Sequence, residues 1–334
     1  MIDLTVTENL SDQRLDKVLK KILREAPDSF IYRMLREKNI TLNGKRAQGS
    51  DRTKEGDVIR FFFSDETYRK MRGQNTSVKS APGSVKAVEE NAGRKPVDER
   101  LLPKILYEDR DVLLFLKPAG LMSQKAAASD YSANDWVLDQ WKARKKDPED
   151  DGFRPSIVNR LDRNTGGIMA AGLSAKGLRI LSEQFRGRTL KKYYLAIVSG
   201  KAQEAYKAFG FIRKAPSENL SIVSDREESG SVPIETDWIR LLYDPDRNLS
   251  LLRVDLVTGK RHQIRAHLSH LGHPILGDPK YGDPSVNHRL RVPYQCLFCE
   301  RVVFPECDLP GISGKSFSVP APEDWPLRPE GETS

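Results

Sequence analysis

The sequence predicts an α+β protein of two domains, and three observations lead to this fold class. The chain has 334 residues, a length for which two domains are the usual expectation. Residues 73–100 contain no Leu, Ile, Phe, Trp or Tyr, and they separate two regions that are rich in apolar residues. In the larger region, strand-like and helix-like patterns are mixed without the regular strand–helix alternation of an α/β protein.

The overall composition favours a polyanionic partner without establishing one. Lys and Arg number 55 against 47 for Asp and Glu, which gives a formal charge of +8. The first residues include acids and lack the apolar core of a signal peptide. No apolar run reaches the roughly 18 residues needed to span a bilayer. We therefore expect a cytoplasmic protein that does not associate with membranes.

Residues 12–63 are predicted to form a small first domain. In QRLDKVLKKIL the apolar residues recur at helical spacing, and they are Leu15, Val18, Leu19, Ile22 and Leu23. Pro27 interrupts this helix, and a second helix with Ser29 as its N-cap should follow. Asn43-Gly44 predicts a tight turn, and GDVIRFFF predicts a closing strand.

Basic residues outnumber acidic ones between Arg14 and Arg46, so this first domain suits a module that reads the phosphate backbone of RNA. A merely solvated basic face is the alternative. The candidate RNA-binding side chains are Arg14, Lys17, Arg33, Arg36, Lys45 and Arg46.

Residues 64–100 are predicted to be a flexible linker, because a segment so poor in apolar side chains cannot offset the entropy lost on ordering. Residues 101–322 form the predicted large domain, and residues 323–334 are expected to be a loose tail. The three cysteines, Cys296, Cys299 and Cys307, are odd in number, which argues against a disulfide framework. CLFC lacks the second pair that a structural zinc site needs, so we expect buried thiols.

The segment NRLDRNTGG, residues 159–167, places Asp162 between two arginines in a loop before a predicted strand, GGIMAAGL. Ser174 is the predicted N-cap of the helix that follows this strand. Loops held on a rigid scaffold are where catalytic groups concentrate. A loop-stabilising ion pair worth up to about 1 kcal/mol is the alternative interpretation of the same residues.

Two further segments carry groups suited to chemistry. TLKKYYLAIVSG, residues 189–200, predicts a strand with Tyr193 and Tyr194 on opposite faces, so that one ring could stack on a base or act on a proton. Residues 251–282 predict a strand, then a helix that begins near His262 and stops at Gly272. The four histidines of this segment do not have the spacing of a zinc-binding helix, so no metal is expected.

Together these segments resemble the RluA/RluC/RluD family of pseudouridine synthases. NRLDRNTGG is similar to the family's H-R-L-D-x-x-T-S-G, and KKYYLAIVSG is similar to its K-x-Y-x-A segment. TGKRHQIRAHLSHLGHPILGDPKYG matches T-G-R-x-H-Q-I-R-x-H…G-H-P-I-x-G-D-x-x-Y-G nearly throughout, and LFLKPAGLMSQ resembles K-P-x-G-L. The resemblance covers most of residues 101–305, and residues 13–63 resemble the S-four RNA-binding domain.

The resemblance implies roles for individual residues. Asp162 matches the family's catalytic aspartate, Tyr194 its site tyrosine, and Arg265 the arginine that pairs with the aspartate. Arg160 matches the arginine that fills the space left by a flipped base. The other substrate-binding candidates are Lys117, Thr165, Lys192, Lys260, His262 and Gln263. We also expect Arg265→Ala to impair catalysis more than folding.

Two positions depart from the family pattern. Asn159 stands where the family has histidine, and in the pair Gly166-Gly167 a glycine stands where it has serine. Neither is the aspartate, so these departures bear on substrate choice and loop geometry more than on the chemistry.

The implied activity is the isomerisation of uridines in RNA, above all large-subunit ribosomal RNA, to pseudouridine without a cofactor. Asp162 would either attack the anomeric carbon or remove the adjacent ribose proton to give a glycal. The implied fold is a mixed, largely antiparallel central sheet with flanking helices, in a monomer. A non-catalytic RNA-binding protein and a magnesium-dependent phosphotransfer enzyme remain the alternatives; the latter needs further acidic ligands, which the sequence does not offer.

Overall fold

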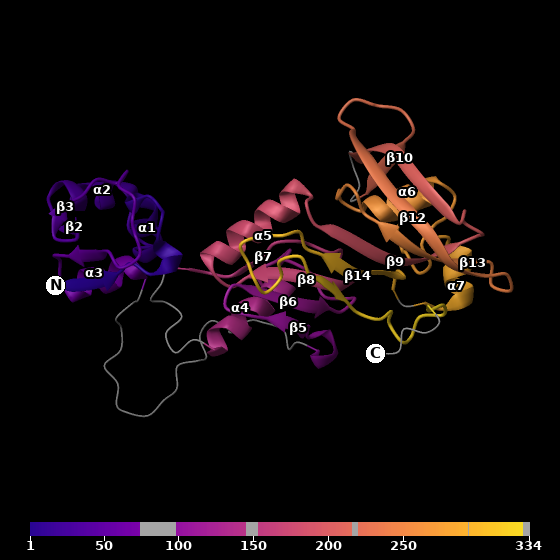
Figure 1. Cartoon of the computed structure of the whole chain (residues 1–334), viewed down its shortest axis with the longest axis horizontal. Helices are drawn as coiled ribbons and strands as arrows, with labels where there is room; N and C mark the ends of the chain where they lie inside the picture. The colour runs from indigo at the N-terminus through magenta and orange to yellow at the C-terminus, as the bar shows by residue number, and fades with distance from the viewer. Residues whose placement is uncertain (74–97, 145–152, 216–219, 293, 330–334) are drawn as a thin grey trace. The chain divides into compact units, whose positions relative to one another are not determined.

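The computed structural model describes residues 1–73, 98–144, 153–215, 220–292 and 294–329 (Figure 1). Contacts divide the chain into two compact units. The first comprises Met1–Arg94, Leu138–Ser156 and Leu173–Lys176, and the second comprises Lys95–Val137, Ile157–Gly172 and Gly177–Ser334. No helix in the described part of the chain is both long enough and apolar enough to cross a membrane.

Residues 1–73 fold as a small antiparallel sheet with helices around one apolar core. The strands β1 (Ile2–Thr5), β2 (Ile40–Leu42), β3 (Lys45–Arg46) and β4 (Val58–Phe61) pair in the order β1-β4-β2-β3. The helical elements are η1 (Glu8–Leu10), α1 (Leu15–Ile22), α2 (Asp28–Arg36) and α3 (Asp65–Arg72). All five apolar residues predicted to share one face around α1 are buried in this core, and the predicted helix is confirmed.

The start of the second helix differs from the sequence prediction. Its N-cap is Pro27, and Ser29 lies inside its first turn. Proline already has the backbone φ of a helix entry and lacks an N–H to satisfy, so it can begin a helix without a capping side chain. The predicted turn is confirmed, because Asn43 and Gly44 join β2 to β3 with φ values of 53° and 72°.

The predicted linker begins too early at residue 64. Ser64 caps α3 by accepting a hydrogen bond from the N–H of Thr67 (3.2 Å). Tyr68 of this helix is buried, with its ring 5.1 Å from that of Phe61. This aromatic contact supplies the apolar burial that the composition of the later residues cannot. Residues 74–97 of the predicted linker lie outside the described residues, and η2 (Glu99–Leu101) follows them.

The second unit is built on one large sheet. Its central path runs β11-β10-β12-β13-β9-β14-β8-β6-β5, with β15 beside β14 and β7 beside β8. The strands are β5 (Lys104–Glu108), β6 (Val112–Lys117), β7 (Ser156–Ile157), β8 (Gly166–Gly172), β9 (Lys191–Ser199), β10 (Ala205–Lys214), β11 (Ser221–Ser224), β12 (Val232–Asp244), β13 (Leu249–Asp255), β14 (Leu297–Val303) and β15 (Ser316–Ser318). Along this path only β14 and β8 pair in parallel, so the predicted α+β class with a largely antiparallel sheet is confirmed for the described residues.

The helices of the larger region are α4 (Ala133–Arg144), α5 (Ala175–Gly187), α6 (Gln263–His270) and α7 (Pro284–Leu290). α5 begins directly after Ser174, and Gly272 follows α6 with a φ of 82°, as the sequence predicts. α6 packs against β11 and β12 (Figure 1). This contact places the first turn of α6 over one face of the sheet.

The predicted loose tail is ordered in its described part. Leu327 is 6% exposed and belongs to an apolar cluster with Leu195 and Leu249, and Trp325 packs against the same cluster. Two large apolar side chains so close to the end of the sequence give this segment a reason to stay on the sheet. Residues 330–334 lie outside the described residues.

Candidate active site

Asp162 lies in the loop between β7 and β8, and hydrogen bonds hold this loop on both sides of the aspartate. The N–H of Thr165 donates to the carbonyl of Asp162 (3.1 Å). The hydroxyl of Ser123 donates to the carbonyl of Leu161 (2.7 Å) and accepts from its N–H (3.0 Å). The backbone that carries the carboxylate is therefore fixed before any substrate arrives.

Lys117, a predicted substrate-binding residue, lies beneath this loop rather than in a groove. Its ammonium group is fully buried and donates to the carbonyls of Pro118 (2.9 Å), Leu121 (2.7 Å) and Arg163 (3.1 Å). Burial lowers the pKa of Lys117 to about 7, although the nearby charge of Asp162 acts in the opposite direction. The lysine thus joins two loops through their backbone.

Arg265, in the first turn of α6, joins Asp162 to a second aspartate. Its Nη1 donates to Oδ2 of Asp162 at 2.6 Å, while Nε and Nη2 donate to the two oxygens of Asp278 at 2.7 and 2.8 Å. The side chain of Asp278 is 0% exposed and that of Asp162 is 28% exposed. Burial alone would raise the pKa of Asp278, but the hydrogen bonds and charge of Arg265 outweigh it and lower that pKa.

A groove of about 1110 Å³ opens above Asp162. Most of the predicted catalytic and substrate-binding residues line it, and these are Arg160, Asp162, Thr165, Lys192, Tyr194, Lys260, His262, Gln263 and Arg265. Burial lowers the pKa of Lys192, whereas Arg160 and Lys260 are exposed. A groove with several cations around one accessible carboxylate can hold a polyanion and present one of its sugars to that carboxylate.

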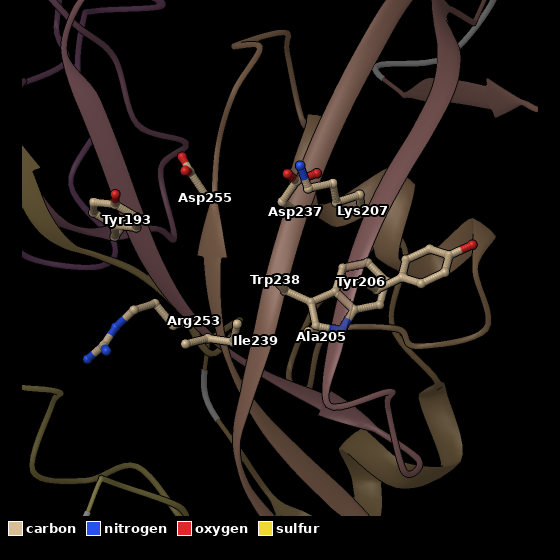
Figure 2. A pocket seen from close by; sticks show the side chains of 9 residues that line it. All are labelled: Tyr193, Ala205, Tyr206, Lys207, Asp237, Trp238, Ile239, Arg253 and Asp255. Carbon is tan, nitrogen blue, oxygen red and sulfur yellow. The ribbon is translucent and has the colours of Figure 1, made fainter.

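The two tyrosines of β9 point to opposite faces of the sheet, as predicted. Tyr194 lines the groove of Asp162 and is 6% exposed, and burial raises its pKa well above the usual value, with Cys299 adding to the shift. Tyr193 lines a separate depression of about 410 Å³, beside Asp255 (Figure 2). Because its hydroxyl stays protonated, Tyr194 is suited to packing on a ring rather than to acting as a base.

Two of the predicted substrate-binding residues use their polar groups in hydrogen bonds within the protein. The amide of Gln263 donates to the carbonyl of Glu235 and the hydroxyl of Thr236, both at 2.9 Å, and its oxygen accepts from the N–H of Lys260 (3.0 Å). The hydroxyl of Thr165 accepts from the amide of Gln295 (2.6 Å). Both residues therefore shape the walls of the groove.

Three residues that shape the site were not predicted as site residues from the sequence. Asp278 and Tyr281 both lie in GDPKYG, which matches the G-D-x-x-Y-G end of the family motif, and that match was the available signal. Phe185 of α5 lines the groove, although an apolar side chain on a helix is ordinarily expected in the core. One side of a helix can face a groove as well as a core, so periodicity alone does not separate the two.

Asn159, which departs from the family pattern, and Gly167, which matches the glycine of the family's T-S-G, both have structural roles. The side-chain oxygen of Asn159 accepts from the N–H of Ala170 (2.9 Å), which fastens the site loop to β8. Gly167 has a φ of 122°, and a Cβ added there would lie 2.4 Å from the N of Cys299 and 2.5 Å from its O. The parallel contact of β8 with β14 therefore leaves no room for a side chain at residue 167.

We expect Gly167→Ser to destabilise the protein by at least about 2 kcal/mol, because it combines a left-handed backbone with overlap against fixed backbone atoms. Urea unfolding would measure this. Gly230→Ser is the matched control, since Gly230 has a φ of 76° and no atom within 4 Å of an added Cβ. Equal destabilisation by the two variants would contradict the steric argument.

The six predicted RNA-binding side chains of the first domain are all exposed. Arg14 is engaged in part, because its Nη2 contacts Oδ2 of Asp16 at 2.7 Å. The guanidinium of Arg33 lies over the ring of Phe30 at 5.6 Å. The basic face is thus available to a polyanion, with one of its members already partly neutralised.

Neither the cysteines nor the histidines gather into a cluster suited to a metal in the described part of the chain. Cys296 and Cys299 are buried around the start of β14, and burial raises the pKa of each thiol to about 12. These two thiols are therefore unreactive packing groups, as their sequence context predicts.

The fold and this site define the class of RNA pseudouridylate synthases, to which the chain belongs. The model of the RNA pseudouridylate synthase family matches residues 111–270, and that of the S4 domain matches residues 13–59. The ribosomal large subunit pseudouridine synthase C of Haemophilus influenzae is 30% identical over 86% of this chain and 81% of that protein. The protein of the same name from Escherichia coli K12 is 29% identical over 85% of this chain and 81% of its own length.

Solved structures show the same fold in the larger region. Human RNA Pseudouridylate Synthase Domain Containing 4 superimposes with a TM-score of 0.53 and 20% identity, covering 66% of this chain and 89% of that chain. Human RNA Pseudouridylate Synthase Domain Containing 1 gives a TM-score of 0.52, 20% identity, and coverage of 69% and 86%.

Proposed function

We propose that this enzyme converts uridines of large-subunit ribosomal RNA to pseudouridine, with the carboxylate of Asp162 acting on the ribose. One observation supports the catalytic assignment above others. Asp162 is a partly exposed carboxylate at the floor of a basic groove, held by an arginine that is itself neutralised by the buried Asp278. The ribosomal substrate is inferred from the names of the relatives, and a cytoplasmic enzyme follows from that substrate. That the enzyme is a monomer is a separate proposal.

The proposed sequence of events begins with extrusion of the target uridine from its stack, which costs a few kcal/mol. Arg160 is exposed and lines the groove, and in this proposal its side chain fills the vacated space. Lys192 and Lys260 neutralise phosphates, and Tyr194 packs on the uracil. These contacts hold the ribose over Asp162.

The chemical step uses the oxygen of Asp162 that Arg265 leaves free. Arg265 binds Oδ2, so Oδ1 is the oxygen available to the sugar. In one route Oδ1 bonds to the anomeric carbon as the base leaves, and in the other it takes the neighbouring ribose proton and a glycal forms. The carbon at position 5 of the base then bonds to the anomeric carbon, as the bond to Oδ1 breaks in the first route and as Asp162 returns the proton to the ribose in the second. In both routes carbon 5 loses its proton and N1 gains one.

We also propose that residues 12–63 are an RNA-binding domain and that residues 101–322 are the catalytic domain. The match of the S4 domain to residues 13–59 and the exposed basic side chains support the first assignment. In this arrangement the first domain adds non-specific affinity for the phosphate backbone, and the groove selects the uridine.

The proposed function is tested by tritium release from ribosomal RNA that carries tritium at position 5 of uridine. We expect release from large-subunit RNA with a metal chelator present, and much less from small-subunit RNA. Tight binding of both RNAs with no release from either would favour the non-catalytic RNA-binding protein. Release that needs magnesium would contradict catalysis by Asp162 without a metal.

A further inference from the structure

The backbone of His262 has an unusual conformation at the entrance to α6. This residue is the N-cap of the helix, with φ 53° and ψ 17°, and its side chain is 8% exposed. A left-handed conformation is unfavourable at a residue other than glycine, and it often marks a functional site. Here it directs a buried imidazole to the groove beside Asp162.

Hydrogen bonds determine which nitrogen of His262 carries the proton. The N–H of Ser221 donates to the hydroxyl oxygen of Tyr281 (2.7 Å), and that hydroxyl lies 2.9 Å from Nδ1 of His262. In the described part of the chain Nδ1 is the one acceptor that this hydroxyl reaches, so we assign the tyrosine's single proton to that bond, while its oxygen accepts from Ser221. A neutral imidazole that accepts at Nδ1 carries its proton on Nε2.

The imidazole is neutral at physiological pH. Burial, helped by the charges of three nearby cations, lowers the pKa of His262 to about 4, although the charge of Asp162 acts in the opposite direction. The cations are Arg265, Arg261 and Lys280. A neutral ring leaves the negative charge of Asp162 in place for its reaction with the sugar. An imidazolium at the same position would compete with the ribose for that carboxylate.

The Nε2 proton is available to the substrate. Nε2 lies 3.9 Å from Oδ2 of Asp162, which is too far for a hydrogen bond, and that oxygen is already bound to Arg265 at 2.6 Å. The Nε2–H group of His262 therefore lies next to the carboxylate of Asp162 without donating a hydrogen bond to it.

The reaction creates an acceptor beside the reacting sugar. When the bond between the anomeric carbon and N1 breaks, its electron pair leaves with the uracil, whose charge is shared between N1, O2 and O4. In uridine, O2 is the oxygen next to N1 and so lies close to the sugar. Turning the ring about the axis through N3 and C6 exchanges N1 with C5 and also exchanges O2 with O4. One fixed donor can thus serve O2 during cleavage and O4 during rejoining.

We propose that His262 is a further catalytic residue, whose Nε2–H donates to O2 of the departing uracil and then to O4 of the turned ring. Tyr281 is the positioning residue that sets the tautomer. This inference deepens the proposed function and rests on it. A preorganised donor aimed at developing charge contributes roughly 100-fold or more in rate in other enzymes.

The test changes both partners of the proposed hydrogen bond, the donor by mutation of His262 and the acceptor by replacement of O2 with sulfur. Single-turnover rates are measured for the wild type, His262→Ala and His262→Gln on RNA with uridine or 2-thiouridine at the target, since sulfur is a weaker acceptor than oxygen. We expect His262→Ala to lower the rate on uridine roughly 100-fold with RNA affinity unchanged. The 2-thio substitution should slow the wild type at least about 10-fold but slow His262→Ala by less than about 2-fold.

His262→Gln keeps a neutral N–H donor, so it should recover part of the rate and part of the sensitivity to sulfur. His270→Ala is the control, because His270 is on the same helix but is exposed and pairs with Asp225 at 2.9 Å; its rate should equal that of the wild type. An equal thio effect in the wild type and His262→Ala would overturn this inference alone. A wild type inactive on uridine would overturn the proposed function and this inference with it.

Discussion

Asp162→Asn is expected to reduce pseudouridine formation by at least about a thousand-fold while the protein remains folded. An amide has the same shape as the carboxylate, but it neither bonds to the anomeric carbon nor removes a ribose proton. Stability should change little, because Asp162 is 28% exposed and Arg265 keeps both of its bonds to Asp278. The backbone carbonyl that accepts from Thr165 is also unaffected.

Three measurements check this expectation together: single-turnover tritium release, RNA affinity and the melting temperature. Binding should match the wild type, and Tm should move by no more than about 2–4 °C. Asp225→Asn is a matched control with an exposed carboxylate that does not line the groove, and it should retain full activity. Asp162→Asn with more than a tenth of the wild-type rate would remove Asp162 from the mechanism.

Arg265→Ala is expected to lose both activity and stability, which changes the expectation drawn from the sequence. The sequence paired Arg265 with the catalytic aspartate alone, so its removal was expected to affect mainly catalysis. In the structure the same guanidinium neutralises Asp278, whose side chain is 0% exposed. Removing one partner of such a buried pair typically costs about 3–5 kcal/mol.

A double variant separates the two effects. Arg265→Met with Asp278→Asn removes both buried charges, and the asparagine oxygen can still accept from the N–H groups of Lys280 and Tyr281. We expect urea unfolding to show that the double variant regains most of the stability that Arg265→Met alone loses. Its catalytic rate should remain at least about 100-fold below the wild type. Recovery of the rate together with stability would show that Arg265 acts only in folding.

The sequence predicted those parts of the fold that depend on local patterns. The helix α1 follows from the spacing of apolar residues, and the turn at Asn43-Gly44 follows from residues that tolerate positive φ. The N-cap at Pro27 and the helix α3 were missed. In α3 the decisive contact is that of Tyr68 with Phe61, and composition does not register a contact between separate elements.

In the candidate site, too, the sequence predicted what local motifs carry and missed what depends on contacts between distant residues. Motif similarity placed Asp162, Tyr194 and Arg265, and the structure brings all three to one groove. The sequence could not distinguish the residues that bond to the protein from those that face the groove, because Gln263 and His262 are neighbours in one motif. The direction of each side chain depends on the left-handed backbone at His262 and on partners far away in the chain, such as Glu235 and Tyr281.

The three hydrogen bonds from Lys117 bear on which partner, the protein or the RNA, changes conformation when the two bind. They fix the loops around Asp162 from below, through a side chain that has no exposed surface for an RNA to displace. The catalytic floor is thus rigid, and the RNA must supply the deformation that brings a nucleotide onto it. An enzyme with a rigid site selects uridines whose neighbouring nucleotides deform easily. Loosely stacked, unpaired uridines are accessible to it, and uridines inside regular helices are not.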